Sequence, residues 1–210
     1  RVGIEVRAFE GDGRVRRALL SDGTRMDCDM VIIGKGVLPA LSFVPRDRVD
    51  VDLGIVVDAH METSVSGIYA AGDVAEFIDI ARDTRWVNAI WPEAVMQGRI
   101  AGINMAGRRV AYRGSLSRNV IRIFGLDVMT AGVVNPAESD GCEVMAEASP
   151  RRRTYRKLVF REDRLVGMVM VGDIEQGGLL MNLIQSLRPV TGDREALMAR
   201  SFNYARLMNA

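Results

Sequence analysis

The first half of the chain carries short apolar stretches bounded by turn residues, a pattern typical of β-strands. Five stretches show this pattern: residues 3–9, 14–20, 29–34, 54–57 and 68–71. Gly11-Asp12-Gly13 predicts a hairpin turn between the first two stretches, and Asp22-Gly23 predicts a second turn after them. The third stretch is apolar without a break, which predicts a strand buried on both faces of a parallel sheet.

Residues 92–106 predict a helix. Pro92 suits the first turn of a helix because its missing N–H costs nothing there. Glu93 would complement the positive end of the helix dipole. Residues 94, 96–97, 100–101 and 103–104 are expected to give this helix an apolar face with small residues. Gly98 and Gly102 lie four positions apart, so they would let that face approach another element closely.

The pattern changes again after residue 113, where longer strands follow one another at short intervals. These strands are predicted over residues 119–124, 128–133, 142–148, 154–160 and 165–171. Two helices are expected after them, over residues 179–187 and 194–208. A run of antiparallel strands that is followed by helices predicts an α+β arrangement for this part of the chain.

Composition limits the classes of protein to consider. The 210 residues are 48% apolar and 26% charged with a net charge of +1, so no general field attracts nucleic acid. The apolar runs are shorter than the roughly 20 residues that a membrane helix needs, which predicts no membrane partner. Cys28 and Cys142 form no paired motif, which suits a reducing cytoplasm. His60 is the single histidine, so no metal site is expected.

The segment 63–73 carries the most informative chemistry, because its apolar stretch ends in Gly72-Asp73. Ligands of open α/β sheets bind at the carboxyl ends of the strands. A glycine there lets a cofactor approach the backbone closely, and Asp73 could accept a hydrogen bond from a sugar or polyol hydroxyl. A tight turn without a ligand is the alternative interpretation, since Gly-Asp is common turn chemistry.

The segment resembles the second flavin-binding motif of the FAD-dependent pyridine nucleotide-disulfide oxidoreductases. The matching positions are Thr63, Ile68, Tyr69, Ala70, Gly72 and Asp73. Residues 30–39, which include Gly36, resemble the strand and loop that close the family's NAD-binding domain. Residues 91–107 resemble its flavin-facing helix. The chain is therefore identified as the C-terminal part of a family member, similar to NADH-rubredoxin reductases, NADH oxidases and the large subunit of nitrite reductase.

The resemblance implies a fold and a division into domains. It implies an α/β fold, with residues 1–40 ending an NAD-binding domain and residues 41–113 forming the C-terminal part of a doubly wound FAD-binding domain. Residues 114–210 would form an α+β C-terminal interface domain. The family's two Gly-x-Gly-x-x-Gly turns have no counterpart here, so FAD and NAD(P)H would both need an N-terminal region outside this sequence.

The resemblance also implies roles for particular residues. Gly72 and Asp73 would bind the ribityl part of FAD, and Trp91 and Ala94 would lie beside its ring. The N-terminus of the helix, with Pro92 and Glu93, would stabilise the negative charge of reduced flavin. Gly36 is a further cofactor-binding candidate, and no residue is assigned a catalytic role. The alternatives are a helix that only packs tightly and a Trp91 that is a core aromatic.

The function implied is electron transfer from NAD(P)H through FAD to an acceptor, namely a small redox protein, oxygen, a disulfide or nitrite. The fragment alone would be inactive. Homodimerisation and a small electron-carrier protein as partner are expected by the same resemblance. The alternative function is a non-catalytic dimerisation or interaction fragment of such a protein.

Overall fold

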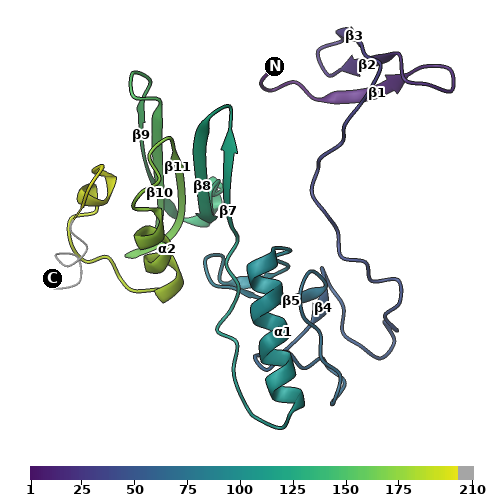
Figure 1. Cartoon of the computed structure of the whole chain (residues 1–210), viewed down its shortest axis with the longest axis vertical. Coiled ribbons are helices and arrows are strands. Elements are labelled where there is room, and N and C mark those ends of the chain that lie inside the picture. The colour runs from purple at the N-terminus through teal and green to yellow at the C-terminus, as the bar shows by residue number, and fades with distance from the viewer. Residues whose placement is uncertain (203–210) are drawn as a thin grey trace. The chain divides into compact units, whose positions relative to one another are not determined.

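The computed structural model describes residues 1–202 and divides the chain into two units, Arg1–Leu38 and Pro39–Ala210 (Figure 1). The first unit is an antiparallel sheet in the order β1-β2-β3. Its strands are β1 (Val6–Glu10), β2 (Arg17–Leu20) and β3 (Arg25–Asp27). Both predicted turns join consecutive strands of this sheet, so the predicted hairpin is confirmed.

The strand predicted over residues 29–34 is wrong. These residues form no strand, and most of them are exposed, with Ile32 at 87%. An apolar strand of a parallel sheet is buried only when neighbouring strands and covering helices are present. The first unit supplies only its small antiparallel sheet, so this apolar run has no partner there.

The second unit begins with a small mixed sheet in the order β4-β5-β6, in which β4 and β5 are parallel. Its strands are β4 (Ile55–Val56), β5 (Ala75–Asp79) and β6 (Thr84–Trp86). The prediction over residues 54–57 is confirmed. The strand predicted over residues 68–71 is wrong, because Tyr69 makes only an isolated bridge to Glu62 and no neighbouring strand extends it.

Helix α1 (Trp91–Met105) confirms the predicted helix and most of its predicted packing face, to which Glu93 is added. Its buried residues are Glu93, Gln97, Ile100, Ala101 and Asn104. Gly98 and Gly102 are exposed, and an added Cβ at either would meet nothing within 4 Å among the described residues. The expected close approach at these glycines is therefore wrong, because both lie outside the buried face of the helix.

The rest of the second unit is an antiparallel sheet of five strands in the order β7-β8-β11-β10-β9. Its strands are β7 (Arg118–Ile123), β8 (Leu126–Gly132), β9 (Cys142–Ser149), β10 (Thr154–Arg161) and β11 (Arg164–Val171). Helix α2 (Gly177–Ser186) packs on β11 and β8 (Figure 1). All five strands and this helix were predicted within two residues of their observed ends.

The last predicted helix, over residues 194–208, is wrong where the structure describes it. A short 3-10 helix (Glu195–Met198) forms there, and Ala199 then turns to an extended backbone with ψ 149°. Residues 203–208 of this prediction lie outside the described residues. Asp193 accepts a hydrogen bond from the Glu195 N–H over 2.9 Å, and Arg194 pairs with Glu143 over 2.7 Å. Leu197 is the buried residue of this short helix, so no continuous apolar stripe supports a longer one.

Buried apolar residues of the second unit form two clusters. One contains Val49, Ile55, Val57, Met61, Ala70, Ala75, Ile100, Ala101 and Tyr112. The other lies between α2 and the five-stranded sheet and includes Leu158, Phe160, Met168, Leu180 and Ile184. The fully buried Asp79 accepts hydrogen bonds from Asn88 (2.8 Å) and Arg82 (3.0 Å). No helix described in residues 1–202 is long and apolar enough to cross a bilayer.

Candidate functional site

The Gly72-Asp73 turn lies against the first turns of α1. The Gly72 N–H donates to Gln97 Oε1 over 2.8 Å, and a Cβ added at Gly72 would lie 3.5 Å from the Cβ of Ala94. Gly72 has a φ of +81°, a conformation that residues with a Cβ rarely adopt. The conformation, more than the space, therefore requires glycine here. The structure thus brings Gly72 and Ala94 together, as two of the predicted site residues.

Two of the other predicted residues present free surfaces beside this contact. Asp73 is exposed and makes no hydrogen bond or ion pair within residues 1–202. Trp91 is the first residue of α1 and is 83% exposed, so the interpretation as a core aromatic is wrong for the described chain. An unengaged carboxylate and an exposed aromatic face are both available to a ligand.

The N-terminus of α1 has no side-chain cap. Its N-cap residue, Ile90, makes no side-chain capping hydrogen bond, and Pro92 in the first turn has no N–H. The Glu93 and Ala94 N–H groups both donate to the Ile90 carbonyl oxygen over 3.1 Å, so within residues 1–202 the Trp91 N–H is the unpaired donor of this turn. This N–H group and the positive end of the helix dipole favour negative charge. A negatively charged group of a ligand would therefore be stabilised at this end of α1.

Glu93 points away from that open end, into the protein. Its side chain is 6% exposed, and Arg118 Nη1 lies 3.0 Å from Glu93 Oε1. The Tyr112 hydroxyl donates a hydrogen bond to Glu93 Oε2. Tyr112 also packs beside Phe77, with ring centroids 5.7 Å apart. Glu93 therefore joins α1 to Tyr112 and to the first residue of β7.

Burial raises the pKa of the Tyr112 hydroxyl far above its usual range, and the hydrogen bond to Glu93 raises it further. Desolvation disfavours the phenolate, and a nearby carboxylate disfavours it again. Tyr112 is consequently a fixed proton donor to Glu93 at neutral pH.

Sequence reasoning missed three residues of this site: Gln97, Tyr112 and Arg118. Gln97 was predicted on the packing face of the helix and is buried there, but its hydrogen bond with the Gly72 N–H was not predicted. Tyr112 and Arg118 lie outside α1, and only the fold shows that they meet Glu93.

Gly36 belongs to the first unit, where it is exposed with a φ of +87°. No cluster of histidine, cysteine and carboxylate side chains within residues 1–202 could hold a metal ion. Both cysteines of the chain, Cys28 and Cys142, are free thiols.

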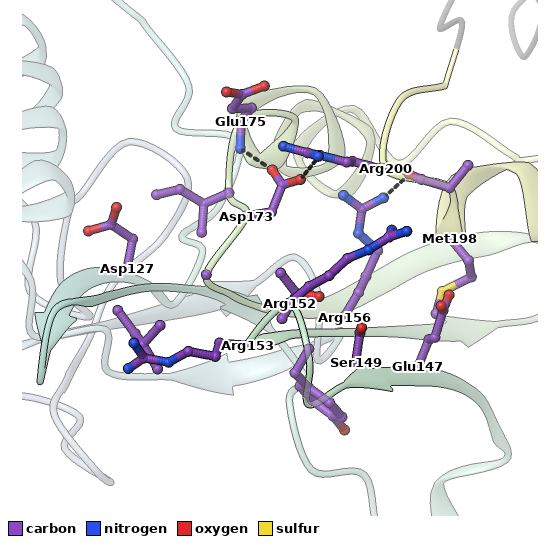
Figure 2. Close-up of a pocket in the computed structure, with 16 residues that line it drawn as sticks. Asp127, Glu147, Ser149, Arg152, Arg153, Arg156, Asp173, Glu175, Met198 and Arg200 are labelled. Carbon is purple, nitrogen blue, oxygen red and sulfur yellow. Dashed lines mark hydrogen bonds and ion pairs between the residues drawn. The ribbon is translucent and has the colours of Figure 1, made fainter.

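A separate cavity of about 800 Å³ lies beside β10 and the loop that follows β11 (Figure 2). Its charged lining residues are Arg152, Arg153, Arg156, Arg200, Asp127, Glu147, Asp173 and Glu175. Asp173 Oδ2 lies 2.7 Å from Arg200 Nε, and Arg156 donates to the carbonyl oxygens of Leu197 and Ala199. The opposite charges offset one another, so we assign no cofactor to this cavity.

Two protein-family models match the chain. The first is the pyridine nucleotide-disulphide oxidoreductase family, over residues 1–98, and the second is the rubredoxin NAD+ reductase C-terminal domain, over residues 118–187. The first match confirms the resemblance to the FAD-dependent pyridine nucleotide-disulphide oxidoreductases seen in the motif of residues 63–73. FAD and NAD(P)H are the cofactors of this family, as predicted.

Curated relatives agree with this assignment. Nitrite reductase [NAD(P)H] of Bacillus subtilis (strain 168) is 30% identical over 176 residues, which are 83% of this chain and 21% of the relative. The epsilon subunit of NADH-dependent phenylglyoxylate dehydrogenase from Aromatoleum evansii is 28% identical and is matched over 97% of this chain and 48% of the relative. NADH-rubredoxin oxidoreductase of Clostridium acetobutylicum is 28% identical, over 80% and 41%. The chain thus spans from about a fifth to half of these relatives' length.

Solved structures share the fold. The putidaredoxin reductase in its covalent complex with putidaredoxin has a TM-score of 0.77 at 25% identity, covering 93% of this chain and 48% of that one. The NAD-dependent persulfide reductase from A. fulgidus has a TM-score of 0.78 at 24% identity, covering 95% and 40%. The mixed arrangement of sheets and helices is therefore the fold of this family, as predicted in its coarse form.

Proposed function

We propose that this chain is part of a flavoprotein that moves electrons from NAD(P)H through FAD to an acceptor. The chain would supply part of the FAD site and the domain that follows it. One observation carries the proposal. A Gly-Asp turn with an unengaged carboxylate lies against Ala94 and Gln97 in the first turns of α1, a helix that begins with the exposed Trp91. The relatives are all longer than the chain, so the remainder of the cofactor site would come from outside it.

The residues of this site fit the chemistry of a flavin. Asp73 would accept a hydrogen bond from a cofactor hydroxyl, and Gly72 would let the cofactor approach the backbone. Trp91 and Ala94 offer apolar surface for an aromatic ring. The open end of α1 would stabilise negative charge on the cofactor. Bound FAD supplies the hydride and electron chemistry, while these residues bind and orient it.

We assign the finer domain limits by the same proposal. Residues 1–40 would end an NAD-binding domain, with Gly36 in its closing loop, and residues 41–113 would form the C-terminal part of a doubly wound FAD domain. Residues 114–210 would form the interface domain. The two clusters of buried apolar residues in the second unit support a division near residue 113, with Ala81 the one buried residue of the later cluster that precedes it among the described residues.

We propose a small electron-carrier protein as one partner, supported by the match to the rubredoxin NAD+ reductase C-terminal domain. We also propose a homodimer. Val120 and Ile121 of the edge strand β7 are exposed, and Phe124 at the following turn is 96% exposed. The free cysteines, Cys28 and Cys142, support a reducing compartment such as the cytoplasm. Sedimentation that shows only monomers over a wide concentration range would contradict the homodimer.

FAD retention tests the proposed function. In the holoprotein that contains this chain, Asp73→Ala should lower FAD affinity by at least tenfold, since a charge-assisted hydrogen bond contributes about 1.5–3 kcal/mol. Asp47→Ala is the matched control, because Asp47 is also exposed and makes no interaction within residues 1–202. Affinity is measured by flavin fluorescence during titration of the apoprotein with FAD.

Loss of affinity in Asp73→Ala with an unchanged Asp47→Ala would support the site. A wild-type holoprotein that never retains a flavin absorption spectrum would instead favour the second function, a non-catalytic interaction module. Equal affinities in all three proteins would show that FAD binds without Asp73.

A further inference from the structure

Glu93 and Arg118 form an ion pair behind the open end of α1. Glu93 is the third residue of α1, at a position where a carboxylate offsets part of the positive helix dipole. Arg118 begins β7 in the following sheet, and its side chain is only 23% exposed. The charge of the helix N-terminus therefore depends on a residue from another element.

Burial strengthens the electrostatic interaction between Glu93 and Arg118. The Glu93 side chain is 6% exposed, so little water screens its charge, and the 3.0 Å contact with Arg118 compensates it. Removing one partner of a buried pair leaves the other charge uncompensated. Without Arg118, the first turn of α1 would become more negative, and without the Glu93 carboxylate it would become more positive.

Tyr112 holds the carboxylate in place. Its hydroxyl donates to Glu93 Oε2, whereas Arg118 pairs with Glu93 Oε1. Gln97, one turn further along α1, fixes the Gly72 N–H. The buried face of α1 thus orients both the turn of the candidate site and the charge at its edge.

We propose that Arg118 and Tyr112 are positioning residues of the flavin site, which act through the carboxylate of Glu93 to set the reduction potential of the bound flavin. The inference rests on the proposed function, because it requires FAD at the N-terminus of α1. Reduction adds negative charge to the flavin, so a more negative helix end lowers the potential and a more positive one raises it.

The test is a redox titration of the flavin in the holoprotein. Arg118→Gln should lower the midpoint potential and Glu93→Gln should raise it, each by at least a tenfold change in the equilibrium constant of reduction, about 30 mV for a two-electron couple. The double variant should lie near the wild-type potential, and Arg118→Lys, which keeps the positive charge, should also stay near it. Arg122→Gln is the control, since Arg122 is in the same strand and pairs with Asp127 at the exposed surface.

Opposite shifts in the two single variants, with an unchanged Arg122→Gln, support the inference. One potential in every variant overturns it while the proposed function stands. Shifts of the same sign in both variants also overturn it, because local damage would then explain them better than charge. A wild-type holoprotein without flavin overturns the inference and the proposed function together.

Discussion

At the scale of single residues, a substitution of Gly72 tests the left-handed backbone conformation of the Gly72-Asp73 turn. Gly72→Ala should lower the free energy of unfolding by about 1–2 kcal/mol, because its φ of +81° strains any residue with a Cβ. The contact with Ala94 adds little, since 3.5 Å is an ordinary separation. Urea denaturation followed by circular dichroism measures the change.

Gly98→Ala is the control for this substitution. Gly98 lies inside α1 with nothing within 4 Å of an added Cβ, so alanine should raise stability by about 0.5–1 kcal/mol. Equal effects of the two substitutions would contradict the assignment of strain to the Gly72 turn.

Tyr112 gives a prediction about pH. Its pKa is higher in the folded protein than the usual value of 10.0, so the folded state holds this proton more tightly than the unfolded state. The resulting stabilisation is complete below about pH 10 and falls by up to about 1.4 kcal/mol per pH unit above it. Tyr112→Phe lacks this proton, so the stability advantage of wild type over the variant should shrink as the pH rises from about 9 to about 11.

Urea unfolding of both proteins at each pH provides the measurement. A constant difference across this range would mean that the proton of Tyr112 is not held by burial and Glu93.

Sequence analysis at this scale could find the residues of the motif but not their partners. Gly72 and Asp73 follow from the motif, and Trp91 and Ala94 follow from the helix next to it. The buried contacts of Glu93 could not be predicted, because a glutamate near a helix start is usually a solvated partner of the dipole. Only the fold brings Arg118 to it.

At the scale of elements, α2 shows how a buried helix face stabilises the second sheet. Leu180 is 0% exposed between α2 and the sheet, whereas its neighbour Leu179 is 39% exposed. Leu180→Ala should therefore cost about 2–5 kcal/mol, from lost burial and from the cavity left behind. Leu179→Ala should cost about 1 kcal/mol at most. Thermal or urea unfolding of both variants checks the difference, and similar losses would contradict this packing.

The elements that the sequence predicted well are those whose apolar pattern matches their burial. The strands β8, β10 and β11 carry continuous or alternating apolar residues that face the core under α2. Strand β5 escaped prediction because it buries two carboxylates, Glu76 and Asp79. A strand that buries polar residues lacks the alternation of apolar and polar positions by which strands are predicted.

At the scale of the whole molecule, the apolar run of residues 29–34 illustrates how a correct family assignment can give a wrong local structure. The run has the sequence of a strand in a parallel sheet, and the family assignment agrees with that reading. Within residues 1–202 no strand lies beside it, so it has neither hydrogen-bond partners nor cover. Long-range partners, more than local propensity, decide whether such a segment is a strand.

Hydrogen exchange can test whether the proposed larger flavoprotein supplies those partners. Residues 31–38 make no backbone hydrogen bond within residues 1–202, so their amides should exchange quickly in the 210-residue chain. Amides of β10 and β11, which pair along their length, should exchange far more slowly. In the complete flavoprotein, the amides of residues 31–34 should become protected, because a strand in a parallel sheet is bonded on both sides. The exchange of the β10 amides serves as the internal standard for comparing the two proteins. Fast exchange of residues 31–34 in both proteins would show that this segment is not a strand of that sheet.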